Sequence, residues 1–181
     1  PKDVSVLILA SEEVLAMDIN SMISALNLRN IKSVEIKPYS SNQANQQGVT
    51  FRDFEIFVQK WIESDVEKEF TFINEERIHE CLDRRYNAFS DDHIYITPNG
   101  TFGVLDFDSM DNEVFMELND LGDYESWAKT ERERVTSNAI CSKCPFLGNC
   151  LTEHYRDVKD LENSCNGFRG LLEWYERHNR N

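Results

Sequence analysis

The sequence predicts an α/β fold, followed by a small α+β domain with a β-hairpin and a cysteine-rich metal loop. Apolar runs at residues 4–10 and 33–38 flank an amphipathic segment at 12–27, the order of a strand, a helix and a strand. An Asn-Gly pair at residues 99–100 separates two β-rich runs, which is a strong signal for a tight turn. Four of the five cysteines fall within residues 141–165, close enough to share a metal ion.

The first half reads as a parallel βαβ unit. Residues 4–10 are apolar almost throughout, which is typical of a strand buried on both faces. Ser11 can cap a helix from about Glu12 to Asn27, and the next strand ends at Pro38 because proline cannot donate to a sheet. Two parallel strands cannot form a core alone, so we expect further strands or a partner surface.

Four further helices are expected downstream. Thr50 and Asp53 form a capping-box pattern before a helix whose apolar face holds Phe54, Phe57, Val58 and Trp61. A charged helix over residues 75–85 contains Cys81, a short one covers 124–135, and a terminal one covers 167–178. The last should turn its aromatic residues Phe168, Trp174 and Tyr175 into a core.

The hairpin covers residues 94–107. Its two β-rich runs are joined through Pro98-Asn99-Gly100, in which glycine can adopt the positive φ that a tight turn requires.

Composition limits the classes of partner. The chain has 181 residues, with 33 acidic against 19 basic side chains and a net charge of −14. A nucleic-acid backbone is therefore excluded as the main partner, because phosphate binding needs clustered Lys and Arg, whereas a basic peptide remains compatible. The chain contains neither an apolar run long enough to span a bilayer nor a signal-peptide pattern. An odd number of cysteines without a secretory context indicates metal-bound thiolates in a reducing, cytoplasmic compartment.

The cysteine loop is the main candidate site. It reads Cys141-Ser-Lys-Cys144-Pro-Phe-Leu-Gly-Asn-Cys150, with Cys165 further on. A Cys-x2-Cys pair presents two thiolates from one turn, and two more complete a tetrahedral shell. The residue types allow either a [4Fe–4S] cluster or a structural zinc ion.

The order of hairpin, short helix, Cys-x2-Cys-x5-Cys and distant cysteine resembles the SPASM domain of radical SAM enzymes that mature peptides and proteins. The resemblance covers about residues 75–181, and residues 1–74 resemble less specifically the last strands and helices of a radical SAM partial barrel. It implies that Cys141, Cys144, Cys150 and Cys165 ligate an auxiliary [4Fe–4S] cluster.

The second cluster that the family normally holds is expected to be absent here. Its ligand positions, counted from Gly100 and Cys150, fall on Leu105 and His154, and only Cys81 lies upstream of the hairpin. Leucine cannot ligate iron, and two remaining ligands are too few for a cluster. Cys81 is expected to be a small buried apolar residue, since unpaired cysteines often are.

The resemblance places the chain at the C-terminal end of a radical SAM/SPASM protein, where it docks a peptide or protein substrate for radical-based maturation. No Cys-x3-Cys-x2-Cys motif precedes Cys81, so this chain alone is not expected to catalyse the reaction. S-adenosylmethionine and the remainder of the barrel would belong to the full-length parent. The alternative is a non-catalytic pseudo-enzyme or scaffold with a four-cysteine zinc or cluster module.

Overall fold

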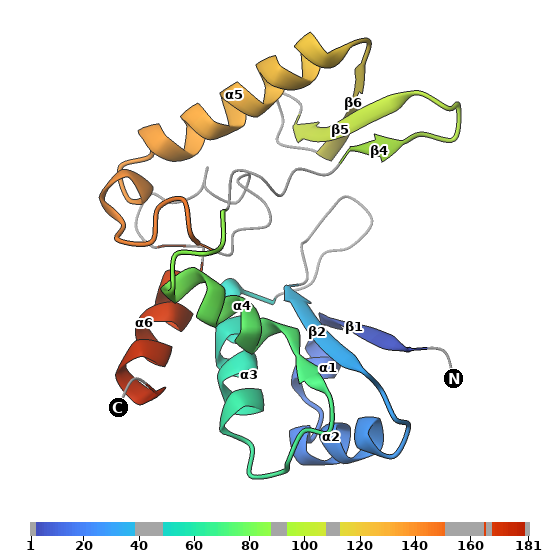
Figure 1. Cartoon of the computed structure of the whole chain (residues 1–181), viewed down its shortest axis with the longest axis vertical. Helices are drawn as coiled ribbons and strands as arrows, with labels where there is room; N and C mark the ends of the chain where they lie inside the picture. The colour runs from blue at the N-terminus through green and yellow to red at the C-terminus, as the bar shows by residue number, and fades with distance from the viewer. Residues whose placement is uncertain are drawn as a thin grey trace.

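The computed structural model describes residues 3–38, 49–87, 94–107, 113–150, 165 and 168–179. Within these ranges the chain is a mixed α/β structure with two separate three-stranded sheets. The parallel sheet lies at one end, and the antiparallel sheet lies at the other (Figure 1).

The parallel sheet contains β1 (Ser5–Ala10), β2 (Ser33–Pro38) and β3 (Thr71–Phe72), in that order. The β1 and β2 strands pair in parallel over their whole length, from Ser5 opposite Ser33 to Ala10 opposite Pro38. This confirms the predicted βαβ unit. The third strand was not predicted, because two residues are too few to show a period in the sequence.

The crossover after β1 is two helices, α1 (Glu12–Leu15) and α2 (Ile19–Asn27), where the sequence predicted one. Ser11 caps α1 as predicted, by accepting from the backbone N–H of Val14. Asp18 then caps α2 by accepting from the N–H of Ser21 at 2.8 Å. A second N-cap inside an apolar periodic segment restarts the helix, because Asp favours caps over helix interiors.

A single apolar cluster, called the main core below, holds most of the described structure together. The α3 helix (Phe51–Glu63) begins at the predicted capping box and buries Phe54, Phe57, Val58 and Trp61. Trp61 is fully buried and stacks on Phe72 of β3, with ring centroids 5.4 Å apart.

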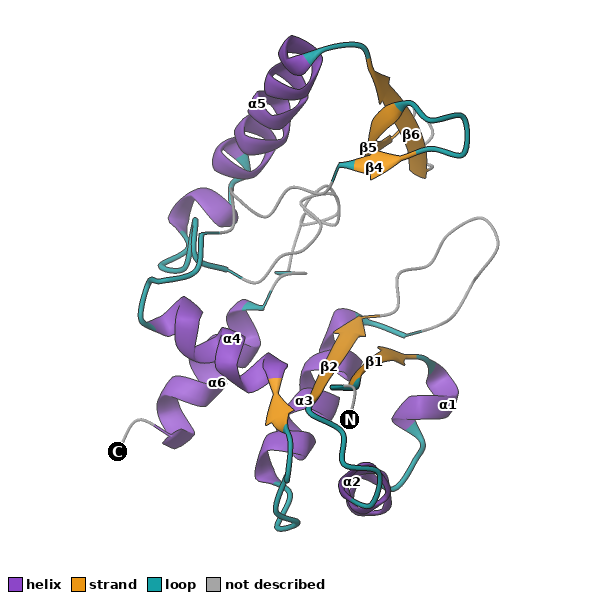
Figure 2. Ribbon diagram, turned by 45° about the vertical axis from the view of Figure 1, so that its right-hand side comes forward, coloured by secondary structure: helices purple, strands orange, loops and turns teal. Residues whose placement is uncertain are grey.

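Two more helices complete the main core, α4 (Ile73–Leu82) and α6 (Arg169–Asn179). Five residues near the end of the chain pack into the same cluster as the parallel sheet. They are Phe168, Leu171, Leu172, Trp174 and Tyr175. Segments far apart in the sequence therefore lie side by side (Figure 2). The main core draws on both sides of the predicted boundary between residues 1–74 and 75–181, and that division stays a prediction.

One face of the parallel sheet lacks the cover that was expected. Val34 and Ile36 face the main core and are buried, whereas Leu7 is 56% exposed and Leu9 is 50% exposed. The prediction that β1 is buried on both faces is therefore wrong for this face. In all-parallel sheets, a strand with a continuous apolar run such as residues 4–10 normally has helices packed on both faces of the sheet.

The antiparallel sheet contains β4 (Tyr95–Ile96), β5 (Phe102–Phe107) and β6 (Glu113–Leu118). The β4–β5 hairpin is confirmed, and Gly100 adopts a φ of +79° in its turn. The sequence did not predict β6. With the long helix α5 (Leu121–Ser137) this sheet forms what is called the hairpin unit below (Figure 1).

The hairpin unit buries little apolar surface. Val104 is fully buried, but Ile96, Phe102 and Phe115 are 72%, 56% and 58% exposed. No helix among the described residues is long and apolar enough to cross a membrane.

Candidate metal centre

The cysteine loop begins directly after α5. Residues Cys141–Lys143 form one 3-10 turn, and the N–H of Cys144 donates to the carbonyl of Cys141 at 2.9 Å. The side chain of Asn138 accepts from the N–H groups of Ile140 and Cys141, at 2.9 and 3.1 Å. The first two cysteines are thus presented from one tight turn, as the Cys-x2-Cys spacing predicted.

The chain then turns back toward the main core. The N–H of Asn149 donates to the carbonyl of Phe146 at 2.9 Å, and Gly148 adopts a φ of +83°. Only glycine adopts that conformation without strain, so Gly148 allows the turn that precedes Cys150. The amide of Asn149 also donates to the carbonyl of Tyr86, which ties the loop to the segment after α4.

Backbone N–H groups are directed at two of the sulfurs. The N–H of Phe146 donates to Cys144, and the N–H of Phe168 donates to Cys150, and each bond favours the thiolate and lowers the pKa of its cysteine. Backbone donors to sulfur are the arrangement that tunes metal–thiolate centres.

Burial opposes ionisation of these thiols. It raises the pKa of Cys141, Cys144 and Cys150, and it is the largest cause at each. Repulsion from Cys165 adds to the rise at all three, and repulsion from Cys144 adds to it at Cys141 and Cys150. Cys165 therefore lies within electrostatic reach of the other three predicted ligands, and repulsion from Cys81 also adds to the rise at Cys150.

The loop lies between the two ends of the molecule. Cys144 and Cys150 pack against the main core. Cys141 instead packs with Ile140 and Leu147 around Val135, which belongs to α5 of the hairpin unit. A group bound by these cysteines would therefore join the hairpin unit to the main core.

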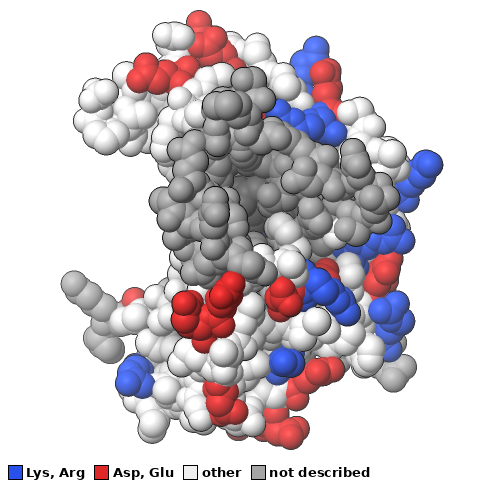
Figure 3. Space-filling model, turned by 180° about the vertical axis from the view of Figure 1, so that it is seen from behind, with Lys and Arg blue, Asp and Glu red and all other residues white. Residues whose placement is uncertain are grey.

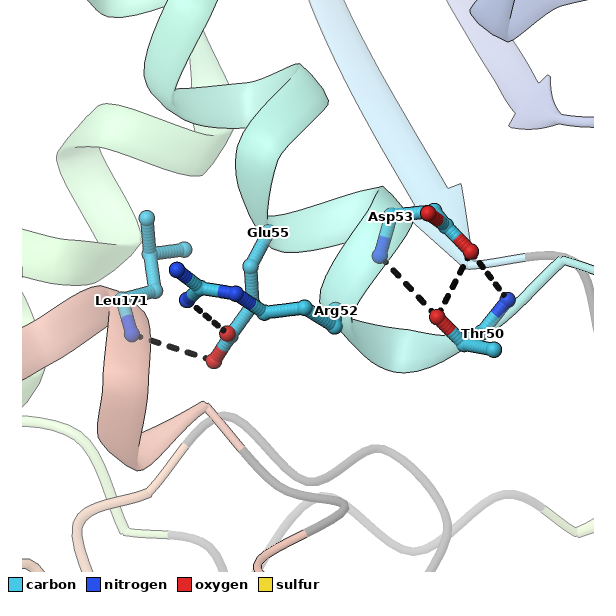
Figure 4. A network of polar contacts seen from close by, with 5 residues as sticks. All are labelled: Thr50, Arg52, Asp53, Glu55 and Leu171. Atoms are coloured by element: carbon cyan, nitrogen blue, oxygen red, sulfur yellow. Dashed lines mark hydrogen bonds and ion pairs between the residues drawn. The ribbon is translucent and has the colours of Figure 1, made fainter.

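The last predicted ligand, Cys165, stands four residues before α6, and a buried carboxylate fixes the start of that helix (Figure 4). Glu55 of α3 accepts from the N–H of Leu171 at 3.1 Å and from Arg52 at 3.1 Å. Its side chain is 8% exposed, and burial raises the pKa of this carboxyl. An acidic group at a helix N-terminus is favourable, because the unpaired N–H groups there carry partial positive charge.

The first turn of α6 also places a cation beside the thiols. Arg169 forms an ion pair with Glu173 at 2.6 Å, and its charge lowers the pKa of Cys144 against the effect of burial.

Cys81 lies in the main core and is 1% exposed. Burial raises the pKa of its thiol to about 12, which confirms the expected small apolar residue. Of the two other positions considered for a second cluster, Leu105 is part of β5 and His154 is outside the described residues.

The thiols are not closed around a metal-sized centre. All five cysteines lie in the described ranges, and none is in a disulfide. Within those ranges no three His, Cys, Asp or Glu side chains have the arrangement that holds a metal ion. The donor set itself fits a thiophilic metal, since it offers four neighbouring thiols and two N–H···S bonds.

Sequence reasoning missed Glu55 and Arg169. A signal for Glu55 did exist, since it stands between Phe54 and Ile56 on a strongly amphipathic helix, and an acidic residue that is buried with the apolar face needs a partner. The identity of that partner, 116 residues away, could not be found from spacing.

Acidic charge is spread over the molecule. Figure 3 shows acidic side chains at both ends of one face and basic side chains gathered along one edge. A comparison of the chain with family models, with curated proteins and with solved structures finds no match.

Proposed function

We propose that this chain is the C-terminal portion of a radical SAM/SPASM protein, in which Cys141, Cys144, Cys150 and Cys165 hold one auxiliary [4Fe–4S] cluster. It would also dock the peptide or protein substrate of the parent enzyme. The observation that supports the proposal is the turn over Cys141–Lys143, which presents Cys141 and Cys144 together, with Cys144 and Cys150 both packed against the main core.

Metal binding would resolve a conflict within the site. Burial holds the thiols protonated, although two of them accept N–H bonds that favour thiolate. A metal displaces the protons and compensates the buried negative charge. Binding would have to draw the sulfurs together, since no three possible ligands among the described residues are arranged around one centre.

The role of the cluster follows from its ligands. A cluster with four cysteine ligands has no open iron, and therefore it serves electron transfer or support instead of substrate turnover. The chain would contribute this accessory site to the parent enzyme, whose S-adenosylmethionine chemistry resides elsewhere.

The open face of the parallel sheet supports the proposed partner. Leu7 and Leu9 are half-exposed, and β1 is an edge strand whose outer side pairs with no other described strand. Parallel sheets normally continue or are covered, because exposed apolar faces and free edges promote association. We assign this edge to the remainder of a radical SAM barrel, which would add a parallel strand beside β1.

A zinc-binding scaffold is the second candidate, and the position of the loop favours it. Cys141 packs on the hairpin unit while Cys144 and Cys150 pack on the main core. A zinc ion at such a junction contributes folding energy and needs no redox chemistry.

The test is anaerobic reconstitution with iron and sulfide, with zinc in a parallel sample. The first candidate predicts about four iron and four sulfide per chain, with the brown colour of a thiolate-bound cluster. Cys165→Ala should lose the metal in either case, because it removes a ligand. Cys81→Ala is the matched control and should keep full occupancy, since that thiol lies in the apolar core.

Each result has a distinct meaning. A colourless protein with one tightly held zinc ion per chain would favour the zinc-binding scaffold and contradict the [4Fe–4S] proposal. Unchanged metal content in Cys165→Ala would show that Cys165 is not a ligand. If the protein retained neither iron nor zinc, both candidate functions would be wrong.

A further inference from the structure

The first turn of α6 is held against α3 by an aromatic contact. Phe168, at the start of that turn, is 5% exposed, and its ring meets those of Phe51 and Phe54 edge-on, with centroids 6.5 and 5.5 Å away. The N–H of Leu172 donates to the carbonyl of Phe168 at 2.9 Å, so the helical hydrogen bonds begin at this residue. The position of Phe168 is therefore set by α3, although the two helices are far apart in the sequence.

A buried carboxylate adds a polar contact to the same turn. Glu55 accepts from the N–H of Leu171 at 3.1 Å and from Arg52 at 3.1 Å (Figure 4). An ideal Cβ at Gly170 would lie 2.8 Å from both carboxylate oxygens, so the absence of a side chain there lets the carboxylate lie against the helix backbone. Removal of Glu55 would leave a buried N–H of the first turn without this acceptor, which costs free energy.

The start of α6 also reaches the cysteine loop. The N–H of Phe168 donates to Cys150, which packs against the main core to which Phe168 belongs. The charge of Arg169 acts on Cys144. Cys165 precedes Phe168 by three residues, and a stretch of that length spans at most about 11 Å. This turn therefore supplies a hydrogen-bond donor, a cation and a short tether for the last predicted ligand.

Metal–thiolate centres respond to groups outside the ligand shell. A hydrogen bond to a ligand sulfur withdraws negative charge from it and orients it, and such partners affect both metal affinity and reduction potential. A shift of the first turn of α6 away from α3 would take the N–H of Phe168 from Cys150 and would loosen the tether of Cys165. The contact between Glu55 and this turn therefore acts on two predicted ligands at once.

We propose that Glu55 is a positioning residue for the metal centre. By fixing the first turn of α6, it holds the N–H of Phe168 on the sulfur of Cys150 and keeps Cys165 within reach of the other thiols. Its carboxylate is engaged by α6 and by Arg52, so it acts through the helix and is not itself a ligand. The inference rests on the proposed metal site and applies to a [4Fe–4S] cluster and to zinc alike.

The first test measures the zinc affinity of the full chain by competition with a chromophoric chelator. Glu55→Ala should weaken zinc binding about tenfold, a loss typical of residues that orient metal ligands. Glu55→Gln should bind nearly as tightly as the wild type, because its amide oxygen can still accept from the N–H of Leu171. Gly170→Ala should resemble Glu55→Ala, since it displaces the carboxylate without altering Glu55 itself. Circular dichroism checks that each variant is folded.

A second readout follows the hydrogen bond itself. In protein loaded with an NMR-active isotope of cadmium, the amide proton of Phe168 should show a scalar coupling to the metal through the sulfur of Cys150. Glu55→Ala should lose this coupling, and Glu55→Gln should keep it. Phe57→Leu is the matched control, because it trims a buried ring of the same helix that packs on Trp61. It should lower stability and leave both the zinc affinity and the coupling unchanged.

Unchanged affinity and coupling in Glu55→Ala would overturn the positioning role and leave the metal site standing. An equal loss in Phe57→Leu would also overturn it, because general destabilisation would then explain the effect. A Glu55→Gln variant as weak as Glu55→Ala would show that the hydrogen-bond acceptor is not what matters. A wild-type chain that takes up neither zinc nor cadmium would overturn the inference, whereas the reconstitution with iron and sulfide decides the proposed function separately.

Discussion

The main core and the hairpin unit differ in how they are held together. In the main core, helices from both ends of the chain bury aromatic and aliphatic side chains, and Trp61, Phe54 and Ile23 are fully enclosed. In the hairpin unit a small sheet exposes more than half of Phe102 and Phe115, and Val104 is fully buried among the strand side chains that the structure describes. We attribute the stability of the fold mainly to the main core. The hairpin unit instead has exposed surface, a cavity and a junction with the main core that a bound metal would stabilise.

The largest expected effect tests this difference in burial. Trp61→Ala should cost about 3–5 kcal/mol of unfolding free energy, because it removes a fully buried ring that stacks on Phe72. Phe115→Ala removes an aromatic ring that is 58% exposed and should cost less than about 1 kcal/mol. Urea unfolding of both variants gives the two values, and similar losses would contradict the contrast between the regions.

The next effect concerns the tie between α3 and α6. A Cβ at Gly170 would lie 2.8 Å from both carboxylate oxygens of Glu55, so Gly170→Ala must displace the carboxylate from the N–H of Leu171. We expect a loss of about 1–2 kcal/mol, typical of a lost helix cap, although Ala is otherwise the better helix former.

A double-mutant cycle sharpens that prediction. In a Glu55→Ala background the clash is gone, so Gly170→Ala should become neutral or stabilising. An equal loss in both backgrounds, measured by urea unfolding, would show that the carboxylate does not meet Gly170.

A smaller effect is expected in the hairpin turn. A Cβ added at Gly100 would meet no atom within 4 Å. The loss of unfolding free energy in Gly100→Ala is therefore only that of placing Ala at a φ of +79°, about 1 kcal/mol. Hydrogen exchange should show faster exchange in β4 and β5 while α3 is unchanged. Faster exchange in α3 would mean that the hairpin unit and the main core unfold together.

The smallest expected effect is a dependence of stability on pH. Burial raises the pKa of the Glu55 carboxyl above its usual range. The folded state therefore binds a proton more readily than the unfolded state, and the contribution of Glu55 is fully present below the unfolded pKa. It is lost as the pH rises through the folded pKa. Urea unfolding at pH 4 and pH 7 should show Glu55→Gln gaining stability relative to wild type at the higher pH, and an opposite trend would mean that the ionised form is favoured.

The sequence predicted most elements that carry a long periodic pattern. The βαβ unit, the capping box at Thr50, the turn at Gly100 and the buried face of α3 were all confirmed. The break between α1 and α2 and the strands β3 and β6 were missed, since a cap or a short strand inside a longer pattern gives a weak local signal.

Contacts between segments that are distant in the chain could not be predicted from the sequence. The spacing of Cys141, Cys144 and Cys150 predicted a turn that presents thiols, and the turn is present. That Cys141 packs on α5 while the other two pack on the main core depends on tertiary structure. The same is true of Glu55 at the start of α6 and of the cavity beside Trp127.

X-ray absorption at the metal edge of reconstituted protein tests the central claim most directly, namely that four cysteines hold one metal centre at the junction of the two regions. The account predicts a first shell of four sulfur atoms, at about 2.3 Å for zinc, and an additional iron–iron contribution for a [4Fe–4S] cluster. Nitrogen or oxygen atoms in the first shell, or fewer than four sulfurs, would contradict it.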